Sequence, residues 1–519
     1  MNGAQALIRT LVNCGVDTCF MNPGTSEMHF VAALDDVPEM HSVLALFEGV
    51  ATGAADGYAR VAGKPAAVLL HLGPGLGNGL ANLHNARRGH TPIVNIVGDH
   101  ATYHAQYDAP LQSDIAAIAS SVSGWMHAAT DATEVATDAA AAVDASMQRP
   151  GRVATLILPA DVCWNDAPGP AERVSSQRDG SPVDDAAVQR AAAALQSGEP
   201  TALLIGGALM RTEGLRASRA VAETCGAKLL SETFPAIMDR GAGIPAVERL
   251  AYLAEFAQMQ LDGVRHLIVA GAARPVSFFA YPGKPSDLVP EGCEVIDLAD
   301  DDADLLAAMT ALAAAVGSDG TCTVQAAGRP ERPSGPLTAQ SVCEALGALL
   351  PEGAVVADEG NTAGLFAPGA TAGAPPHEWM CLTGGSIGYG MPVATGAGVA
   401  LKGTGRRVVN LQADGSALYT IQSLWTQARE GLDVTTIILN NSSYAVLNME
   451  LARVGADPGP RALEMLDISR PDLDFVALAN GLGVTATRAT DAESFTSQLE
   501  AALATPGPNL IEAVIPATL

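Results

Sequence analysis

The stretch that decides the fold is residues 407–444, RVVNLQADGSALYTIQSLWTQAREGLDVTTIILNNSSY. Two aliphatic runs, Arg407–Leu411 and Thr435–Leu439, have the length and composition of buried strands. The segment Ala417–Glu430 between them is helical in pattern. A strand, a crossing helix and a second strand predict two parallel strands of one sheet.

Polar residues follow both strands, Asp414 after the first and Asn441 after the second. The carboxyl ends of parallel strands meet at the edge where such sheets bind ligands, so the two side chains can face one point. A carboxylate, an amide oxygen and a loop carbonyl suit Mg²⁺. Gly415 allows close backbone approach, and Ser416 is expected to open a helix whose N–H groups can meet phosphate. Asp-Gly and Asn-Asn are ordinary turn sequences by themselves, and the strand context favours a metal–diphosphate site.

The same alternation of strands and helices extends outward into three α/β blocks, expected at residues 1–166, 183–316 and 336–519. Each block predicts a doubly wound parallel sheet. The stretches 167–182 and 317–335 are rich in Gly, Pro and polar residues and predict linkers. The other strands are expected at 42–47, 66–71, 93–97, 153–158, 202–205, 227–230, 267–270, 294–298, 354–357 and 510–514.

Composition excludes several classes of function. A net charge of −27, from 56 acidic and 29 basic residues, disfavours binding to nucleic acid or to anionic membranes. The 8 cysteines form no CxxC pair, which predicts reduced thiols, without a zinc site or a disulfide framework. With no signal-like N-terminus and no membrane-length apolar run evident, we expect a cytoplasmic protein.

The run 412–444 resembles the thiamine diphosphate (ThDP) binding motif of the family of benzoylformate decarboxylase and acetolactate synthase. That motif usually begins Gly-Asp-Gly, and here Ala413 replaces the first Gly, ahead of the metal ligand. The resemblance implies that Asp414, Asn441 and the backbone carbonyl of Ser443 hold Mg²⁺. It also implies cofactor contacts from Gly415, Ser416 and Tyr444.

A second segment, GGSIGYGMP at 384–392, is by itself a glycine-rich loop. The family places a bulky apolar residue five positions before the proline, beneath the cofactor, and Ile387 matches it. Such a wedge bends ThDP so that its 4′-amino group faces the thiazolium ring. By the same resemblance the carbonyl of Gly385 would accept a hydrogen bond from that amino group. Asn361 and Thr362, which follow another strand, are placed to contact the diphosphate.

Glu48 follows the strand 42–47 and opens a helical run, 49–62. An acidic residue at that position is also explained by the helix dipole. However, Phe47-Glu48-Gly49 resembles the family segment with the catalytic glutamate. The resemblance implies that Glu48 shares a proton with the pyrimidine ring and so activates ThDP.

His71 lies in LHLGPGLGN at 70–78, at the end of a strand. A histidine at the end of a strand often only makes hydrogen bonds within the protein and has no catalytic role. The Leu-His pair resembles benzoylformate decarboxylase, and the Gly-Pro-Gly resembles acetolactate synthase. We expect His71 to act as a general acid or base. In NPGTSE at 22–27, Thr25 matches a serine that contacts the substrate carboxylate in benzoylformate decarboxylase, and a capped turn fits equally well.

The central block has no G-x-G-x-x-G fingerprint, which disfavours an NAD-linked dehydrogenase. In acetolactate synthases and pyruvate oxidases this block binds FAD, and the sequence leaves FAD open. Benzoylformate decarboxylase carries a second catalytic histidine here. The corresponding segment RPVSFFAY at 274–281 has none, and Phe279 or a neighbour occupies its place.

The resemblance implies a ThDP- and Mg²⁺-dependent non-oxidative 2-oxo acid decarboxylase or carboligase, a lyase or transferase. The alternatives are an acetolactate synthase-type enzyme, possibly with FAD, and a catalytically silent ThDP-fold protein. The resemblance also implies a homodimer or homotetramer, in which Glu48 of one subunit serves the cofactor held by Asp414 and Asn441 of another. The identity of the 2-oxo acid and any regulatory subunit stay open.

Overall fold

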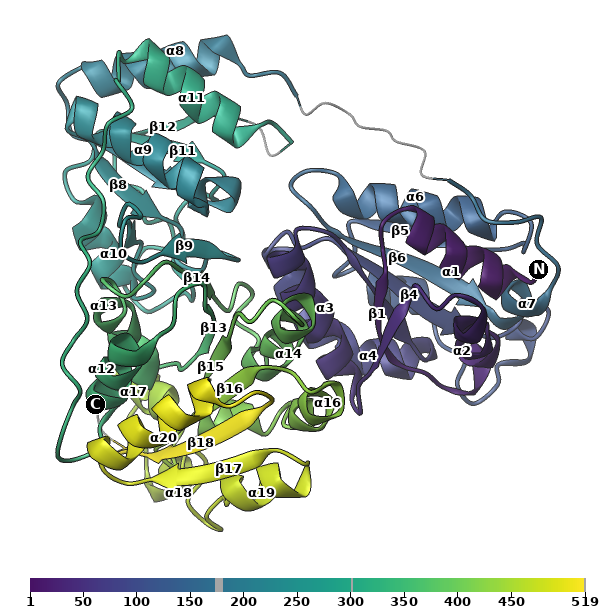
Figure 1. The fold of residues 1–519 in the computed structure, drawn as a ribbon. Coiled ribbons are helices and arrows are strands. Elements are labelled where there is room, and N and C mark those ends of the chain that lie inside the picture. The colour runs from purple at the N-terminus through teal and green to yellow at the C-terminus, as the bar shows by residue number, and fades with distance from the viewer. Residues whose placement is uncertain (173–180, 300–301, 518–519) are drawn as a thin grey trace.

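The computed structural model describes residues 1–172, 181–299 and 302–517, which form three α/β units (Figure 1). Residues 173–180 of the first expected linker, the pair 300–301 and the pair 518–519 lie outside the described residues. Each unit contains one sheet, and almost all strand pairs are parallel. The three doubly wound parallel sheets expected from the sequence are confirmed.

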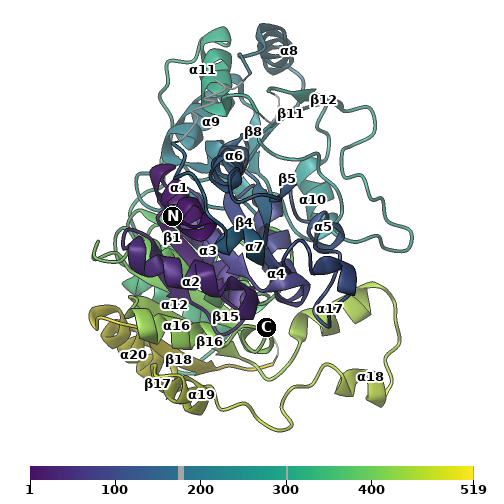
Figure 2. The same ribbon diagram turned by 90° about the vertical axis from the view of Figure 1, so that its right-hand side faces the viewer.

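The first sheet has six parallel strands in the order β2-β1-β3-β4-β6-β5. They are β1 (Thr18–Asn22), β2 (His41–Leu44), β3 (Ala66–Leu70), β4 (Ile93–Asp99), β5 (Trp125–Ala128) and β6 (Val153–Pro159). The two faces are covered by α1 (Gly3–Asn13), α2 (Met28–Ala33) and α6 (Val135–Met147) on one side, and by α3 (Glu48–Ala62) and α4 (Leu72–Arg88) on the other. Successive residues of β3 point to opposite faces: Ala67 packs on the side of α1, α2 and α6, and Val68 packs on the side of α3 and α4. In Figure 2, where this unit faces the viewer, α1 and α2 form its outer surface.

The central sheet has the order β10-β8-β7-β11-β12. Its strands are β7 (Thr201–Ile205), β8 (Lys228–Ser231), β10 (Glu248–Arg249), β11 (His266–Ala270) and β12 (Glu294–Asp297). Its helices are α8 (Asp185–Gln196), α9 (Thr212–Cys225), α10 (Ala254–Leu261) and α11 (Leu305–Ala315). The strand order reverses between β7 and β11, which creates a ligand-binding crevice at their carboxyl ends in sheets of this type.

The third sheet has the order β17-β18-β16-β15-β13-β14-β9. Its strands are β13 (Val355–Glu359), β14 (His377–Met380), β15 (Val408–Ala413), β16 (Val434–Asn440), β17 (Thr485–Ala489), β18 (Asn509–Val514) and the antiparallel β9 (Met238–Arg240). Because β9 comes from the central part of the sequence, the central unit contributes an edge strand to this sheet.

The first and third units pack together through α3 and α14 (Gly390–Ala400), which cross near the centre of Figure 1. Ala54 of α3 and Val393 of α14 belong to one continuous core. This contact fixes the first sheet against the third. No helix among the described residues is long and apolar enough to cross a membrane.

Every strand expected from an aliphatic run is present, with ends shifted by at most three residues. The single helix expected at 417–430 is wrong: α15 (Asp414–Ala417) and α16 (Ser423–Glu430) are separated by a turn, and Ser416 lies within α15 instead of opening a helix. In that turn the Thr420 hydroxyl donates to the carbonyl of Gly388, so a tertiary contact interrupts the helix.

Candidate active site

Glu48 is the first residue of α3 and stands at the carboxyl edge of the first sheet. Asn78 Nδ2 donates a hydrogen bond to Glu48 Oε2 at 3.0 Å. A Cβ placed at Gly75 would lie 3.4 Å from both Glu48 Oε1 and His71 Cβ. The structure therefore brings the expected acid and the expected histidine to the same part of this edge.

His71 follows β3 and precedes α4, and its ring is held by a buried acid. His71 Nδ1 lies 2.8 Å from Glu27 Oε2 and 3.2 Å from Ser26 Oγ. Glu27 also accepts hydrogen bonds from Gly24 N at 2.7 Å and from Ser26 Oγ at 2.6 Å. Among the described residues no hydrogen bond engages His71 Nε2, which leaves this nitrogen available to a ligand.

Gly24 makes this arrangement possible because the histidine ring lies directly against its backbone. A Cβ at Gly24 would lie 2.2 Å from His71 Cγ and Nδ1, closer than any real contact. Thr25, the expected substrate contact, has an exposed side chain at the start of the 3-10 turn η1 (Thr25–Glu27). It is the neighbouring Ser26 that contacts the histidine, and the role of Thr25 stays a prediction.

At the carboxyl edge of the third sheet, Asp414 is buried and held by peptide groups. Its carboxylate accepts hydrogen bonds from the backbone N–H groups of Gly415, Asn441 and Ser442 at 2.7, 3.0 and 2.7 Å. Burial raises the pKa of Asp414, and these donors oppose that rise. Within the described part of the chain Asp414 forms no ion pair, so the buried carboxylate lacks a cation that a bound metal would supply.

The other expected ligand groups belong to the loop whose backbone N–H groups donate to Asp414. Asn441 Oδ1 accepts a hydrogen bond from the backbone N–H of Ser443 at 3.0 Å, which places both residues in one tight turn. Among the described residues there is no group of three or more His, Cys, Asp or Glu side chains that could hold a metal. The available donors are therefore one carboxylate, one amide and a carbonyl, an oxygen set that fits Mg²⁺.

Four more expected cofactor residues lie near this edge. The ring of Tyr444 covers Gly415, since a Cβ there would be 2.4 Å from Tyr444 Cε1. The Ser416 hydroxyl donates to the Ala413 carbonyl and accepts a hydrogen bond from Gln412 Nε2. Asn361 and Thr362 follow β13, which pairs directly with β15, so they share the edge with Asp414.

Gly385 and Ile387 lie in the loop between β14 and α14, which contacts both the first and the third units. Asn85 Nδ2, on α4, donates to the Ser386 carbonyl at 2.8 Å. From the other side, buried Glu359 accepts hydrogen bonds from the backbone N–H groups of Gly388 and Gly390 at 2.7 and 2.6 Å. Burial raises the pKa of Glu359, and the N–H donors oppose that rise. The wedge candidate Ile387 is thus held on a loop fixed at both ends.

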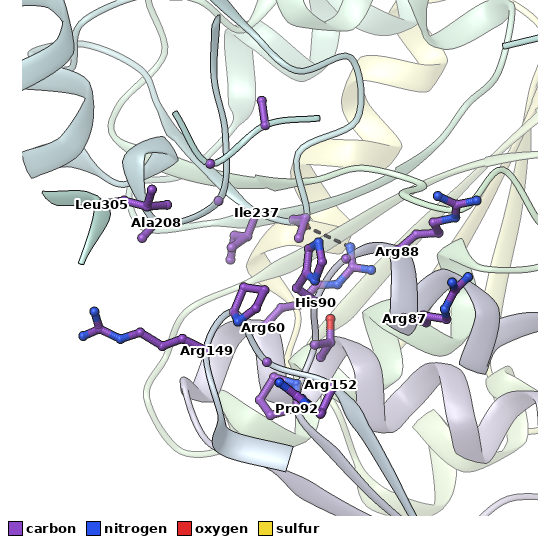
Figure 3. A pocket seen from close by; sticks show the side chains of 18 of the residues that line it. Arg60, Arg87, Arg88, His90, Pro92, Arg149, Arg152, Ala208, Ile237 and Leu305 are labelled. Atoms are coloured by element: carbon purple, nitrogen blue, oxygen red, sulfur yellow. Dashed lines mark hydrogen bonds between the residues drawn. The ribbon is translucent and has the colours of Figure 1, made fainter. Parts of the chain in front are cut away.

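A separate cavity of about 920 Å³ lies between the first and central units (Figure 3). The first unit lines it with cationic side chains, Arg87, Arg88, Arg149 and Arg152. The central unit contributes Gly207 and Gly271, beyond β7 and β11, and Glu232, beyond β8. Cationic side chains facing a sheet crevice suit an anionic ligand such as a dinucleotide diphosphate.

Two family models match the sequence. "Thiamine pyrophosphate enzyme, N-terminal TPP binding domain" covers residues 1–135, and "Thiamine pyrophosphate enzyme, C-terminal TPP binding domain" covers residues 358–513. The chain belongs to the family of ThDP-dependent enzymes.

Related proteins agree with this assignment. A protein of Mycobacterium tuberculosis, named provisionally as an acetolactate synthase large subunit, is 60% identical over 520 residues, and the match covers 99% of both chains. The benzoylformate decarboxylase of Pseudomonas aeruginosa is 29% identical, with 96% of both chains covered. The solved ThDP-dependent 4-hydroxybenzoylformate decarboxylase of Rhodococcus jostii has a TM-score of 0.86 at 24% identity, covering 99% of both chains, and supports the ThDP-enzyme fold.

Sequence reasoning missed two acids at the edges of this ThDP-dependent enzyme. Glu27 holds His71, and Glu359 holds the loop of Ile387. Both lie within motifs that the sequence presents, NPGTSE and DEGNT. Glu27 comes shortly after β1, and Glu359 is the last residue of β13. Their position was a usable signal, but their partners come from distant segments.

Proposed function

We propose that this ThDP-dependent enzyme removes CO₂ from a 2-oxo acid without oxidation. It then either releases an aldehyde or joins the remaining carbon fragment to a second carbonyl compound. The observation that carries the proposal is that both cofactor-binding halves match the family models and each has an acid at the expected sheet edge, Glu48 in one and Asp414 in the other.

The residues at the third sheet fit the cofactor and its metal. Asp414, Asn441 and the carbonyl of Ser443 would hold Mg²⁺. Asp414 is buried and forms no ion pair within the described residues, so a bound cation would favour its charged form. Gly415, Ser416, Tyr444, Asn361 and Thr362 would contact the diphosphate. Bound ThDP would supply the electron sink for loss of CO₂.

The residues at the first sheet would handle protons. Glu48 would hold the proton shared with the pyrimidine ring, while Asn78 fixes the carboxylate. His71 would deliver a proton from Nε2 to the carbon that has lost CO₂, and Glu27 would keep its ring in place through Nδ1. Thr25 would contact the substrate carboxylate.

The proposed active enzyme is a cytoplasmic homodimer or homotetramer. In it, Glu48 of one subunit reaches the cofactor that Asp414 and Asn441 of another subunit hold. The first-sheet and third-sheet edges of one chain are then halves of two different sites.

The test is CO₂ release from a panel of 2-oxo acids, measured on the full-length protein with ThDP and Mg²⁺. We expect turnover by the wild type and a loss of about 10²–10⁴-fold in Glu48→Gln, the usual contribution of a positioned proton-transfer group. The matched control is Glu39→Gln, at an exposed acid of the same unit, which should behave as wild type. Unchanged turnover in Glu48→Gln would remove the proposed activator.

A second candidate is condensation of the acetolactate synthase type, and two observations favour it. One is the 60% identical relative, and the other is the arginine-lined cavity, which suits the diphosphate of FAD. Purified enzyme of this kind would join two pyruvate molecules into a 2-hydroxy-2-methyl-3-oxo acid, with release of one CO₂, and would show a visible flavin band. Protein that binds ThDP but turns over no 2-oxo acid would instead be a silent member of the family.

A further inference from the structure

An aromatic cluster lies on the central unit of a chain that contains only 4% aromatic residues. It consists of Phe234, Tyr252, Phe278 and Phe279, and this set is called the aromatic cluster below. The rings of Phe278 and Phe279 meet edge to face at 4.8 Å, and Tyr252 lies 5.1 Å from Phe278. Phe234 completes the set at 6.1 Å from Phe278. These separations lie within the range of favourable aromatic pairs.

The cluster touches the loop expected to carry the cofactor's aminopyrimidine. Gly385 has a φ of +72°, and a Cβ there would lie 2.6 Å from Phe278 Cζ. The Phe278 ring therefore packs directly on the backbone whose carbonyl is the expected acceptor for the 4′-amino group. If the Gly385 carbonyl accepts the 4′-amino group as expected, the cluster would lie beside that end of the bound cofactor.

The segment that carries Phe278 and Phe279 is also anchored to the third unit. Tyr281 Oη donates to Glu450 Oε2 at 2.8 Å, and the Arg453 guanidinium lies 4.6 Å from the Tyr281 ring centroid. Arg453 also pairs with Glu255 of the central unit at 2.8 Å. Glu450 and Arg453 lie on α17 (Ala445–Arg453), which follows the expected metal loop directly. One helix therefore positions the cluster relative to the metal loop.

The cluster leaves apolar ring surface uncovered in the described chain. Phe278 and Phe279 are 42% and 53% exposed, whereas Phe20, Phe30, Phe475 and Phe495 are completely buried. Exposed aromatic surface gathered beside a reaction site is typical of a ligand-binding wall.

We propose that the aromatic cluster is the wall against which the side chain of the 2-oxo acid packs, and that it selects acids with an aryl side chain over small ones such as pyruvate. This inference rests on the proposed function. A flat aryl group would cover Phe278 and Phe279 in offset or edge-to-face contact, whereas a methyl group would leave most of that surface in water.

The test uses the full-length holoenzyme and three variants: Phe278→Ala, Phe279→Ala and the control Phe256→Ala. Phe256 is 55% exposed on α10 of the same unit. We expect kcat/KM for phenylglyoxylate to fall about 10–100-fold in the two cluster variants, mainly through KM, while kcat/KM for pyruvate changes less than about threefold. The Phe256→Ala variant should behave as wild type for both acids.

Three results would overturn the proposal. The first is a wild type that prefers pyruvate or does not discriminate. The second is a parallel fall for both acids with weaker ThDP binding, which would make the cluster part of the cofactor site. The third is a changed oligomeric state with unchanged substrate preference, which would mean that a second subunit covers the cluster.

A binding measurement separates this inference from the proposed function. Calorimetric titration of ThDP-loaded Glu48→Gln enzyme should show phenylglyoxylate binding at least about tenfold tighter than pyruvate, and Phe278→Ala in that background should abolish the preference. If the wild type turns over none of the acids but this binding preference is present, the proposed reaction is wrong and the proposed role of the aromatic cluster stands. Equal binding of the two acids would contradict the wall.

Discussion

The carboxyl edges of the first and third sheets present their acids in different ways. At the first edge, side chains hold the reacting groups: Asn78 donates to Glu48, and Glu27 holds His71. At the third edge, peptide N–H groups hold Asp414. Peptide donors to a carboxylate favour its charged form, and at Asp414 they oppose the rise in pKa that burial causes. This difference fits the roles proposed for the two edges, proton transfer at the first and binding of a cation at the third.

The largest expected effect separates these two roles in one experiment. Asp414→Asn should weaken Mg²⁺-dependent ThDP binding by more than roughly 10–100-fold. That range is typical when a residue that only hydrogen-bonds a metal ligand is replaced, and Asp414 is itself an expected ligand. Glu48→Gln should leave Mg²⁺ binding unchanged and ThDP binding within about tenfold while turnover is lost. Titration of each variant with ThDP at several Mg²⁺ concentrations, followed by protein fluorescence, measures both. Equal loss of cofactor binding in the two variants would erase the distinction between the edges.

A smaller effect tests whether the first edge depends on close packing. Gly24→Ala places a Cβ 2.2 Å from the His71 ring, so the ring must leave Glu27. We expect kcat to fall about 10–100-fold with ThDP affinity unchanged, because only proton delivery is disturbed. Gly77→Ala is the matched control: it lies in α4 with nothing within 4 Å of its added Cβ, and alanine favours the helix. If both variants keep wild-type kcat, the position of His71 does not matter for the reaction.

The sequence predicted which residues lie at the carboxyl edges of the sheets better than it predicted the contacts between distant segments. Aliphatic runs place Asp414 and Asn441 after neighbouring strands, because burial of a parallel strand leaves a local pattern. The break between α15 and α16 was missed, because it depends on a hydrogen bond from Thr420 to a residue 32 positions away. The clustering of Phe278 with Tyr252 likewise depends on the fold of the central unit, and the contact of Phe278 with Gly385 depends on how that unit packs on the third. A single sequence does not encode such partners in its periodicity.

The last expected effect is on stability instead of turnover, and it comes from the central sheet. Among the described residues, Glu232 at the edge of this sheet has fewer hydrogen-bond partners than Asp414 or Glu27. Glu232 follows β8 and accepts a hydrogen bond from Gly207 N at 3.2 Å. Burial raises the pKa of Glu232 from 4.5 to about 7. Between these two values the folded protein binds more protons than the unfolded chain, so stability falls as the pH rises from about 4.5 to 7.

Glu232→Gln should remove this contribution, since an amide stays neutral and still accepts the Gly207 hydrogen bond. We expect the variant to be more stable than wild type by ~3 kcal/mol above pH 7 and nearly equal to it at pH 4.5. Denaturation temperatures measured across this range would show the two curves separating as the pH rises. The exposed control Glu291→Gln should follow the wild-type curve. If the Glu232→Gln curve also follows it, the central-sheet acid is charged at neutral pH, and a nearby cation such as Arg211 of the same cavity would have to compensate it.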